Sequence, residues 1–582
     1  MELHRLARRW IWSIWHMAGR LRSLLRSRGI AGLIKIVFRR TRSHTSYYDW
    51  IHLREYQPSW LPQVLQEIAS FPSGPFLSLF FIPGDAGESE IRLTLDSIER
   101  QIYPDFEVIF VAGLDLHDFI KKQPIKNLKQ FDLNQAVQAA QGSYCAFITP
   151  GAVLAPDLLF EIAKSLQTHP GLDLIYTDHD RLLPDQRRFD PAFKPGWSPD
   201  FLLAGDYIGE LRFFSLAALG KIKLASLSLQ TPGLNYELSL RIGETRPSVL
   251  HIPKVLVSRW APSEMPPSPE FDPQPCVQSA VERAGLSAKL TAVPGHPGLV
   301  IPHFDLAADD LVSIIICTHD QPGLLNACLD SIFHLSRYPQ IEIVLIDHQS
   351  RLAATRKIIE RWKSKEPRRF LVERIEGPFN YSILNNAGVK RSRGKIIVLL
   401  NNDIEVITPN WIEEMAGWAQ RAEIGAVGAC LLYPNRTIQH AGILLGMRDL
   451  AVHAFKGAQA ESPGYLNRLL VPSNFLALTG ACLMMRRSLY DELGGLDEQF
   501  AVAGGDIDLC LRAYRRGYFN VLLPHVRLFH YESATRGYED SPEKMARLKQ
   551  EYDLLRKRWP EQVYSDPFYH PELNRARGDF SI

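Results

Sequence analysis

The sequence predicts an α/β protein that contains two successive units of the same kind. Short apolar runs rich in branched residues alternate with helical patterns over about 71–262 and again over 311–535. This alternation is typical of a mostly parallel sheet with helices on both faces. The patterns follow the same order in both stretches, which indicates an internal duplication. A basic segment at 1–70 precedes the two units.

Length, charge and cysteine content narrow the class of protein. At 582 residues the chain is long enough for three or four modules. Its formal net charge of +2 is not that of a polycation that binds nucleic acid. The seven cysteines include no Cys-x-x-Cys pair, which favours a reducing compartment over a disulfide framework. No apolar run reaches the ~18 residues that a membrane span needs, and we expect no secretory signal.

The basic segment predicts contact with a membrane surface. Within 1–42, apolar residues recur at helical spacing, arginines fill much of the remaining surface and Glu2 is the one acid. A basic amphipathic helix with tryptophans can lie in an anionic membrane interface. The alternative is a helix that docks on the protein's own surface. We expect no nucleic-acid partner, because nothing downstream resembles a module that contacts bases.

Three successive strands of the second unit end in polar or acidic residues. In chain order, these are Thr318 and Asp320, then Asp347, then Asn401, Asn402 and Asp403. Ligands of open α/β sheets bind beyond the carboxyl ends of the strands. Asp403 would therefore lie at the mouth of a site, where a carboxylate can hold a divalent cation on a substrate phosphate. The alternative is that Asn-Asn-Asp only turns the chain.

Two later residues could complete this site. Asp506 follows Gly504 and Gly505 at a helix start, where the helix N-terminus would keep it ionised, as a general base must be. Simple helix capping is the alternative role. His530 ends a further strand, where a neutral imidazole could join a metal shell begun by Asp403. A buried structural histidine is the competing interpretation.

Long stretches of the chain resemble the family-2 inverting glycosyltransferases, which have a GT-A fold. The resemblance covers about 75–575 and is strongest to bacterial tandem-domain members of O-antigen and cell-surface polysaccharide assembly. The matching segments include VSIIICTHD, EIVLIDHQS, FNYSILNNAGV, LLNNDIEVITPNWIEEM, GAVGACLLYPNRTIQHAGILLG, DIDLCLRAYRRGY and HYESATRGYEDSPEK. Each fragment is weak alone, but the ordered set is specific.

The resemblance implies a role for each candidate residue. The nucleotide-sugar side comprises Thr318, Asp320, Asp347, Asn385, Asn401 and Asn402. Asp403 and His530 would hold a divalent cation, Mg²⁺ or Mn²⁺, and Asp506 would be the catalytic base. The acceptor side would include His440 and Gly442. Two positions depart from the family pattern, namely Asn401 in place of an acid and Gly505 where many relatives carry Glu.

The first unit resembles the same fold with its chemistry removed. The metal motif is replaced by Thr149-Pro150-Gly151, the acid after the second strand by Ala112-Gly113, and the base by Asn235. An amide cannot accept the proton that a general base takes. We therefore expect a degenerate pseudo-glycosyltransferase domain at 71–262, the alternative being a divergent active site. The polar stretch Tyr176–Asp180 (YTDHD) could bind a metal, although a structured turn is favoured.

These expectations combine into one domain plan and one function. Residues 263–310 would be a linker, 311–535 the catalytic domain and 536–582 a C-terminal helical brace. The protein would transfer a sugar from a nucleotide-diphosphate sugar to a glycan or lipid-linked glycan acceptor. It would work in the cytoplasm, peripheral on the inner face of the cell membrane. The rivals are a non-catalytic scaffold of a polysaccharide-synthesis complex and a nucleotidyltransferase, although neither unit has a glycine-rich phosphate loop.

Overall fold

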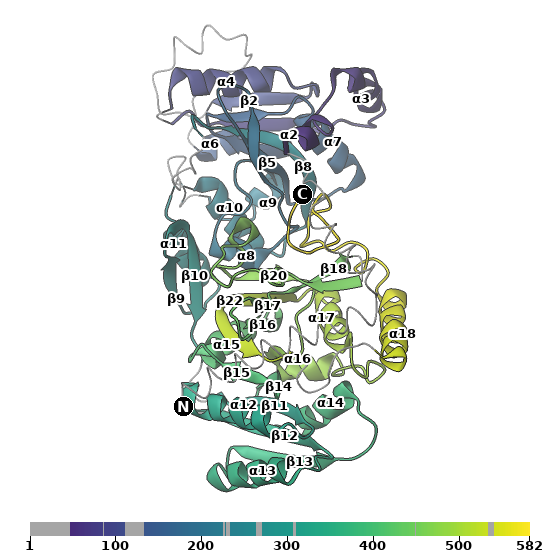
Figure 1. The fold of residues 1–582 in the computed structure, drawn as a ribbon. Helices are drawn as coiled ribbons and strands as arrows, with labels where there is room; N and C mark the ends of the chain where they lie inside the picture. The colour runs from purple at the N-terminus through teal and green to yellow at the C-terminus, as the bar shows by residue number, and fades with distance from the viewer. Residues whose placement is uncertain are drawn as a thin grey trace.

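The computed structural model describes residues 47–84, 86–110, 133–224, 227, 233–263, 271–306, 310–447, 450–532 and 541–582. The basic helix expected within 1–42 lies outside these residues. Two sheet-based units are stacked along the long axis of the molecule, and the C-terminal segment returns to the first of them (Figure 1). The expected α/β fold with two successive sheets is thereby confirmed. None of the described helices is long and apolar enough to cross a membrane.

The first unit is built on a sheet with the strand order β2-β1-β3-β7-β5-β8-β4, and β6 pairs with β5. Its strands are β1 (Leu77–Phe81), β2 (Phe106–Phe110), β3 (Tyr144–Ile148), β4 (Ala152–Leu154), β5 (Leu174–Leu182), β6 (Arg188–Ala192), β7 (Arg212–Ser215) and β8 (Val249–Trp260). Its helices are α4 (Glu88–Glu99), α6 (Leu133–Ala139), α7 (Leu158–Thr168), α8 (Pro199–Ala204), α9 (Leu216–Leu219) and α10 (Leu234–Gly243). The stretch YTDHD lies within strand β5 rather than in a turn.

The second unit is built on a sheet with the order β13-β12-β11-β14-β21-β16-β22-β15, to which β17 and β20 add through β16 and β22. Its strands are β11 (Val312–Thr318), β12 (Ile341–His348), β13 (Phe370–Ile375), β14 (Ile396–Asn401), β15 (Ile404–Val406), β16 (Ile424–Leu432), β17 (Ile438–His440), β18 (Ile443–Met447), β19 (Leu450–His453), β20 (Ser473–Phe475), β21 (Cys482–Arg486) and β22 (Phe519–His530). Its helices are α12 (Pro322–Leu335), α13 (Ala353–Lys365), α14 (Tyr381–Arg391), α15 (Trp411–Ala419), α16 (Arg487–Glu492) and α17 (Gly505–Arg515). Strands β18 and β19 form a separate hairpin.

The two sheets repeat each other strand for strand. The second sheet has one additional strand at its edge, β13. The other seven strands of its main order pair with one another, parallel or antiparallel, as the seven strands of the first sheet do. A buried side-chain bond is repeated as well: the Ser78 hydroxyl donates to Glu107 at 2.8 Å, and Ser313 donates to Glu342 at 2.6 Å. The agreement of topology and of a specific polar contact supports an internal duplication.

Buried apolar strands bring the candidate site to one edge of the second sheet. Ile396–Leu400 are all buried, as expected for a central strand covered on both faces. Strand β14 pairs in parallel with β11, and β11 with β12, so their carboxyl ends meet at the same edge. The polar residues that follow these strands therefore lie near one another.

Further elements flank and connect the two units. Before the first sheet lie α2 (Tyr47–His52), the 3₁₀ helix η1 (Pro58–Trp60) and α3 (Leu61–Ala69). The region 263–310, expected as a linker, contains α11 (Gln274–Arg283) and a hairpin of β9 (Ala288–Val293) and β10 (His296–Phe304). A short 3₁₀ helix, η2 (Tyr465–Asn467), follows β19, and α18 (Pro542–Arg558) packs beside the second unit.

A buried polar network joins the units. Arg421 from the second unit pairs with Asp200 from the first at 2.8 Å, and both side chains are less than a tenth exposed. The Asn474 amide donates to the other oxygen of Asp200 at 2.7 Å. Burial raises the pKa of Asp200, whereas the attraction of Arg421 acts in the opposite direction. Because an unpaired charge is costly inside a protein, this network holds the two units in one arrangement.

Candidate active site

A cavity of about 500 Å³ opens at the carboxyl edge of the second sheet. Its lining includes six of the residues singled out from sequence, namely Thr318, Asn401, Asn402, Asp403, Asp506 and His530. They come from the ends of β11, β14 and β22 and from the start of α17. Residues separated by more than 200 positions in the chain thus meet around one space.

Strand pairing places Asp403 beside His530. Asp403 immediately precedes β15, whose first residue, Ile404, pairs with His530 at the end of β22. The His530 Nε2 atom lies 3.3 Å from Oδ1 of Asp403. On the other side of the ring, Nδ1 lies 3.1 Å from Oε1 of Gln439, an amide oxygen that can only accept, so Nδ1 donates to it. Gln439 therefore orients the ring and leaves Nε2 toward Asp403.

The local charges fit a cation site. Asp403 and His530 are both buried, and Oδ1 of Asp403 has no hydrogen-bond partner among the described residues. Burial lowers the pKa of His530, but the attraction of the nearby Asp403 carboxylate outweighs it and leaves the pKa raised. A buried carboxylate oxygen beside an imidazole offers the O and N donors that Mn²⁺ and related divalent cations accept. Asn401 adds an amide, whose Nδ2 lies 3.5 Å from Nε2 of His530.

Asp506 lies at the start of α17 on another wall of the cavity. The Gly504 before the helix has φ +85°, a conformation that glycine adopts without strain. One Asp506 oxygen accepts from the Gly480 N–H at 2.8 Å and the other from the Ile507 N–H at 2.9 Å. Asp506 is the second residue of the helix rather than the residue before it, so it does not occupy the N-cap position. These contacts fix a half-buried carboxylate that faces the cavity.

Asp320 and Asp347 lie just behind the cavity and hold the loops after β11 and β12. Oδ1 of Asp320 accepts from the backbone N–H groups of Arg351 and Leu352 at 2.9 and 2.8 Å. Asp347 accepts from the Ser350 N–H at 3.0 Å and pairs with Arg374 at 2.8 Å. Neither residue lines the cavity, so contact with a nucleoside stays a prediction.

Three further candidates also lie outside the lining. The Asn385 side chain is buried and donates to Tyr381 O within its own helix at 2.8 Å. His440 is fully buried, with Nδ1 2.8 Å from Nδ1 of His453, and burial lowers the pKa of both rings. Gly442 has φ +101°, and a Cβ there would lie 2.5 Å from the Phe475 ring, so only glycine fits this turn.

The structure adds residues to the cavity that the sequence did not single out. His453 and Glu532 both line it. The Glu532 carboxylate accepts a hydrogen bond from Tyr433 and lies 3.3 Å from Lys456. Burial raises the pKa of Glu532, but Lys456 and Tyr433 outweigh it and hold the pKa well below its usual range. The sequence did hold a signal for Glu532: in His530-Tyr531-Glu532, two polar residues alternate with an aromatic one at the end of a buried strand.

The first unit has different residues at the corresponding positions. Ala152 opens β4 and pairs with Arg259, just as Ile404 opens β15 and pairs with His530. Gly151 therefore corresponds to Asp403, and Arg259 to His530. Asn235 is the second residue of α10, after a glycine with positive φ, and so corresponds to Asp506 on α17.

Comparisons with known proteins agree with the assignment of the site to the second unit. Residues 313–494 match the family model described as "Glycosyl transferase family 2". The protein "Uncharacterized protein y4gI" of Sinorhizobium fredii is 37% identical over 461 residues, which cover 77% of this chain and 50% of that protein. The "O-antigen biosynthesis protein RfbC" of Myxococcus xanthus is 30% identical over 605 residues, covering 98% of this chain and 46% of the relative. The chain thus spans about half the length of these curated relatives.

Solved structures give weaker matches. A mannosyltransferase from Pyrobaculum calidifontis, in complex with GDP-Man and Mn²⁺, is 18% identical with a TM-score of 0.32, covering 48% of this chain and 71% of that one. GalNAc-T7 with UDP, GalNAc and Mn²⁺ is 16% identical with a TM-score of 0.38, covering 52% and 59%. The family match places a domain of glycosyl transferase family 2 in the second unit, at residues 313–494.

Proposed function

We propose that the chain transfers a sugar from a nucleotide-diphosphate sugar to an acceptor hydroxyl with inversion at the anomeric carbon. The supporting observation is the convergence of Asp403, His530 and Asp506 on one cavity of about 500 Å³. This volume lies within the range of small-molecule sites. Two sides of the cavity carry different chemistry, a cation-binding pair on one and a carboxylate fixed by backbone N–H groups on the other.

In this mechanism Asp506 is the general base. It takes the proton of the acceptor hydroxyl as the acceptor oxygen bonds to the anomeric carbon, and the bond from that carbon to the diphosphate oxygen breaks on the opposite face. Such proton transfer contributes typically about 10²–10⁴-fold in rate. Asp403 and His530 would hold Mg²⁺ or Mn²⁺, which when bound neutralises charge on the leaving diphosphate. Gln439 keeps the His530 ring in the required orientation.

The proposed acceptor side is the wall formed by β18 and β19. Ile443, Ala451, Val452 and His453 from this hairpin line the cavity opposite the ends of β11 and β14. His440 and Gly442 lie at its base, where the glycine turn and the His440–His453 contact fix its position. Thr318, Asn401 and Asn402 remain the proposed contacts to the nucleotide, with Asp320, Asp347 and Asn385 shaping the same side from behind.

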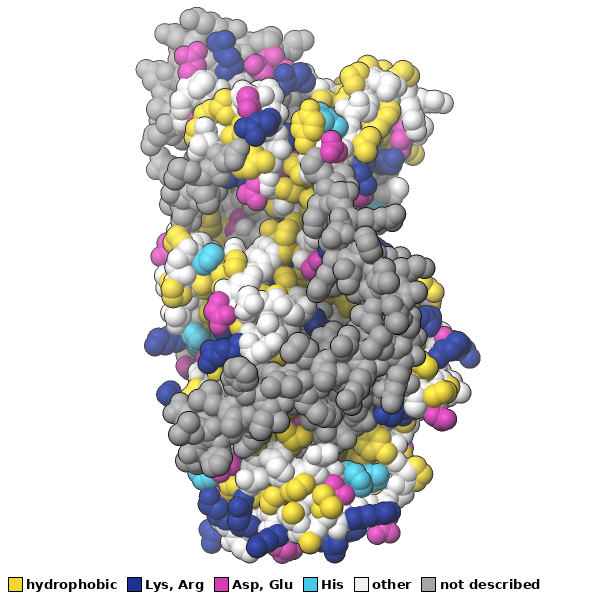
Figure 2. All heavy atoms as spheres, in the orientation of Figure 1, with side chains coloured by type: hydrophobic (Ala, Val, Ile, Leu, Met, Phe, Trp, Pro, Cys, Tyr) yellow, Lys and Arg dark blue, Asp and Glu magenta, His cyan; other side chains and the backbone are white. Residues whose placement is uncertain are grey.

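We propose the domain plan predicted from sequence, with a degenerate domain at 71–262, a connection at 263–310, a catalytic domain at 311–535 and a C-terminal brace at 536–582. The acceptor would be a glycan or lipid-linked glycan of cell-surface polysaccharide synthesis, which fits the resemblance to the O-antigen relative. The basic segment at 1–42 would hold the protein on the cytoplasmic face of the membrane. Figure 2 shows Lys and Arg side chains at the lower end of the second unit, around the basic helix α13.

The test is nucleotide release from purified protein with UDP-, GDP- and dTDP-sugars, in the presence of Mg²⁺, Mn²⁺ or EDTA. We expect metal-dependent release with one donor class, lost in Asp403→Ala and kept in Asp491→Asn, which changes an exposed carboxylate of the same unit. Binding of a nucleotide without turnover would indicate a missing acceptor. Neither release nor metal-dependent nucleotide binding with any donor would contradict the proposal and favour the scaffold.

A further inference from the structure

Two clusters outside the catalytic cavity each place a carboxylate between two histidines. One comprises Asp178, His251 and His570, and the other comprises His303, Glu414 and His525. In each cluster the ligand atoms all lie within 4.8 Å of one another. Two imidazoles and a carboxylate form a common ligand set for zinc and related metals. Their remaining hydrogen bonds decide which cluster can bind one.

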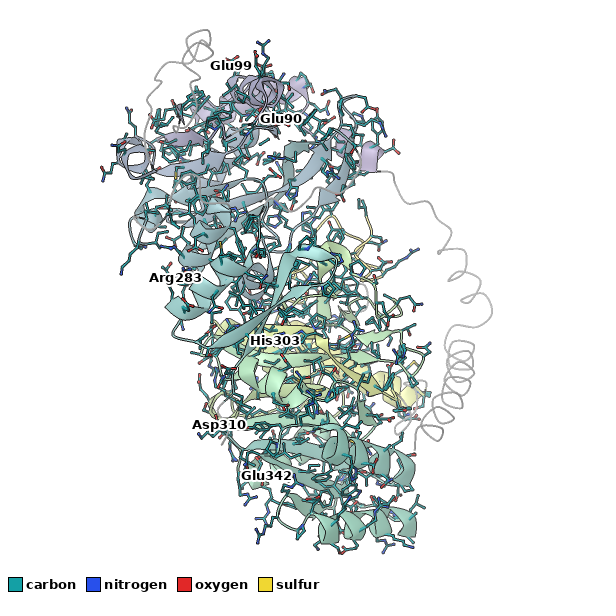
Figure 3. All side chains as sticks on the ribbon, turned by 90° about the vertical axis from the view of Figure 1, so that its left-hand side faces the viewer. Glu90, Glu99, Arg283, His303, Asp310 and Glu342 are labelled. Carbon is teal, nitrogen blue, oxygen red and sulfur yellow. The ribbon has the colours of Figure 1, made fainter. Side chains whose placement is uncertain are left out.

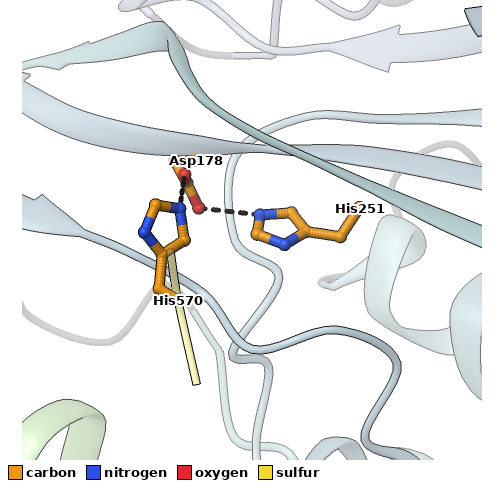
Figure 4. A group of neighbouring side chains, drawn as sticks. All are labelled: Asp178, His251 and His570. Carbon is orange, nitrogen blue, oxygen red and sulfur yellow. Dashed lines mark hydrogen bonds and ion pairs between the residues drawn. The ribbon is translucent and has the colours of Figure 1, made fainter. Parts of the chain in front are cut away.

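The Asp178 cluster is already saturated (Figure 4). Asp178 accepts from Nε2 of His251 at 2.9 Å, from Nε2 of His570 at 2.7 Å and from the Lys194 N–H at 2.9 Å. The Nδ1 atom of His570 in turn accepts the Glu572 N–H at 3.1 Å. That bond places the ring proton on Nε2, so Nε2 has no lone pair for a metal. This cluster ties the C-terminal segment to the first unit by hydrogen bonds alone.

The Glu414 cluster differs in the use of its ring nitrogens. His303 comes from β10, Glu414 from α15 and His525 from β22. Nδ1 of His303 lies 2.8 Å from both Glu414 oxygens, and Nε2 of His525 lies 3.3 Å from one of them. Nδ1 of His525 has no hydrogen-bond partner among the described residues. Without a metal, each ring donates a proton to the Glu414 carboxylate, which can only accept. No described group donates to the outer nitrogen Nδ1 of His525, so its proton can move there and free Nε2 for a metal.

The surroundings of Glu414 also favour a cation. Nδ2 of Asn410 donates to Oε1 of Glu414 at 2.8 Å and so orients the carboxylate, as partners of metal ligands commonly do. The side chains of His303 and His525 are 28% and 16% exposed, so solvent can reach the cluster and supply a further ligand. Figure 3 shows His303 on the side of the molecule where the connecting hairpin crosses to the second unit.

We propose that His303, Glu414 and His525 form a zinc site, with Nδ1 of His303, Nε2 of His525 and a Glu414 oxygen as ligands and water as the fourth. Neighbouring ligands of a tetrahedral zinc lie ~3.3 Å apart at usual bond lengths. The distance from Nε2 of His525 to Glu414 is 3.3 Å, and the distance from Nδ1 of His303, 2.8 Å, would have to open by about 0.5 Å. The ion would join three segments that are distant in sequence, and would fix the β9–β10 hairpin on the catalytic unit. None of the three residues lines the catalytic cavity, so this site is distinct from that of Asp403 and His530, and its two imidazole ligands favour zinc over Mg²⁺.

Zinc binding to the full chain tests the proposal, with every variant made in an Asp403→Ala background to remove the catalytic cation site. We expect one equivalent of Zn²⁺ by competition with a chromophoric chelator, and a rise in melting temperature when zinc is added. His303→Ala should weaken binding by more than ~100-fold, because it removes a ligand, and Asn410→Ala by about 10–100-fold, because it removes only an orienting bond. Both should abolish or reduce the zinc-dependent rise.

Two matched controls separate this site from other histidines. His251→Ala removes a histidine of the saturated Asp178 cluster, and His334→Ala removes an exposed histidine paired with Asp330. Both should retain full zinc binding. His303 is partly exposed, so its replacement leaves a folded chain whose melting temperature without zinc serves as the reference. Unchanged zinc affinity in His303→Ala, or loss of binding in His251→Ala with retention in His303→Ala, would overturn the assignment.

Discussion

The sheets of the two units have the same strand topology but differ at the edge where a ligand would bind. In the second unit, Asp403 and His530 face each other and leave a carboxylate oxygen without a hydrogen-bond partner among the described residues. In the first unit, the corresponding residues are Gly151 and Arg259. A guanidinium thus occupies the place where the second unit would hold a metal ion.

In the first unit, the charge of the Arg259 guanidinium is already neutralised by its contacts. Nη1 of Arg259 lies 3.1 Å from Pro150 O and 3.3 Å from both the Thr149 hydroxyl and a Glu210 oxygen. A Cβ on Gly151 would lie 3.6 Å from Cζ of Arg259, which places the guanidinium directly against this backbone. The strand pairing is thus the same in both units, whereas the position of Asp403 and His530 is taken in the first unit by a residue pair whose arginine contacts Glu210. The same sheet therefore forms whether or not its edge carries the acid and the histidine of a cation site.

The largest contrast concerns the two helix starts. We expect Asp506→Asn to lower transfer activity by about 10²–10⁴-fold, because an amide cannot accept the acceptor proton. Asn235→Asp, at the corresponding position of α10, should add no activity, because Arg259 and Gly151 leave no cation site beside it. Steady-state nucleotide release with donor and acceptor measures both. Activity in Asp506→Asn within threefold of the parent would remove Asp506 from the mechanism.

The pair between the units should dominate stability. Arg421→Ala leaves Asp200 buried and short of one partner, and breaking such a pair typically costs about 3–5 kcal/mol. Arg92→Ala is the matched control, because Arg92 and its partner Glu88 are both more than half exposed and such pairs contribute less than about 1 kcal/mol. Urea unfolding followed by tryptophan fluorescence compares the two. Equal shifts would show that the interface between the units does not depend on this network.

The sequence predicted the elements whose residues follow strict periodicity. Apolar runs located β11, β12 and β14, and the rule for parallel sheets then placed Thr318 and Asn401–Asp403 at one edge. It did not reveal that Asp320 and Asp347 turn back to bind loop N–H groups, because the partner of a carboxylate depends on loop conformation. The proline-rich start of 263–310 also hid the β9–β10 hairpin, whose strands are only partly buried.

The cavity wall formed by β18 and β19 could not be foreseen for a related reason. His453 lines the cavity because it belongs to a hairpin, β18–β19, outside the main sheet. Such a placement depends on tertiary contacts, which no local pattern encodes. Asp506 and His530 were singled out from a helix start and a strand end. No local pattern shows that they meet Asp403, since their separation from it exceeds 100 residues.

Gln439 offers a finer test of the second unit's site. Gln439 is not one of the proposed metal ligands. It acts through His530, because its Oε1 accepts a hydrogen bond from Nδ1 of that ring at 3.1 Å. We expect Gln439→Ala to weaken Mn²⁺ binding by about 10–100-fold, because the His530 ring loses its orientation. Gln439→Glu should retain most of the affinity, because a carboxylate oxygen can also accept from Nδ1. Mn²⁺ titration followed by electron paramagnetic resonance measures the free ion. Equal Mn²⁺ affinities in Gln439→Ala and Gln439→Glu would exclude an orienting role for Gln439.

The smallest expected effect lies at Gly151, where the first unit departs from Asp403. Gly151 has φ +88°, whereas Asp403 is not among the residues with positive φ. Gly151→Ala should therefore lower the free energy of unfolding by about 1–2 kcal/mol through backbone strain, without changing transfer activity or the number of bound Mn²⁺ ions. The same strain means that an aspartate at 151 could not simply restore a metal site. Loss of activity in a folded Gly151→Ala protein would show that the first unit takes part in the reaction, which would break the contrast between the two sheets.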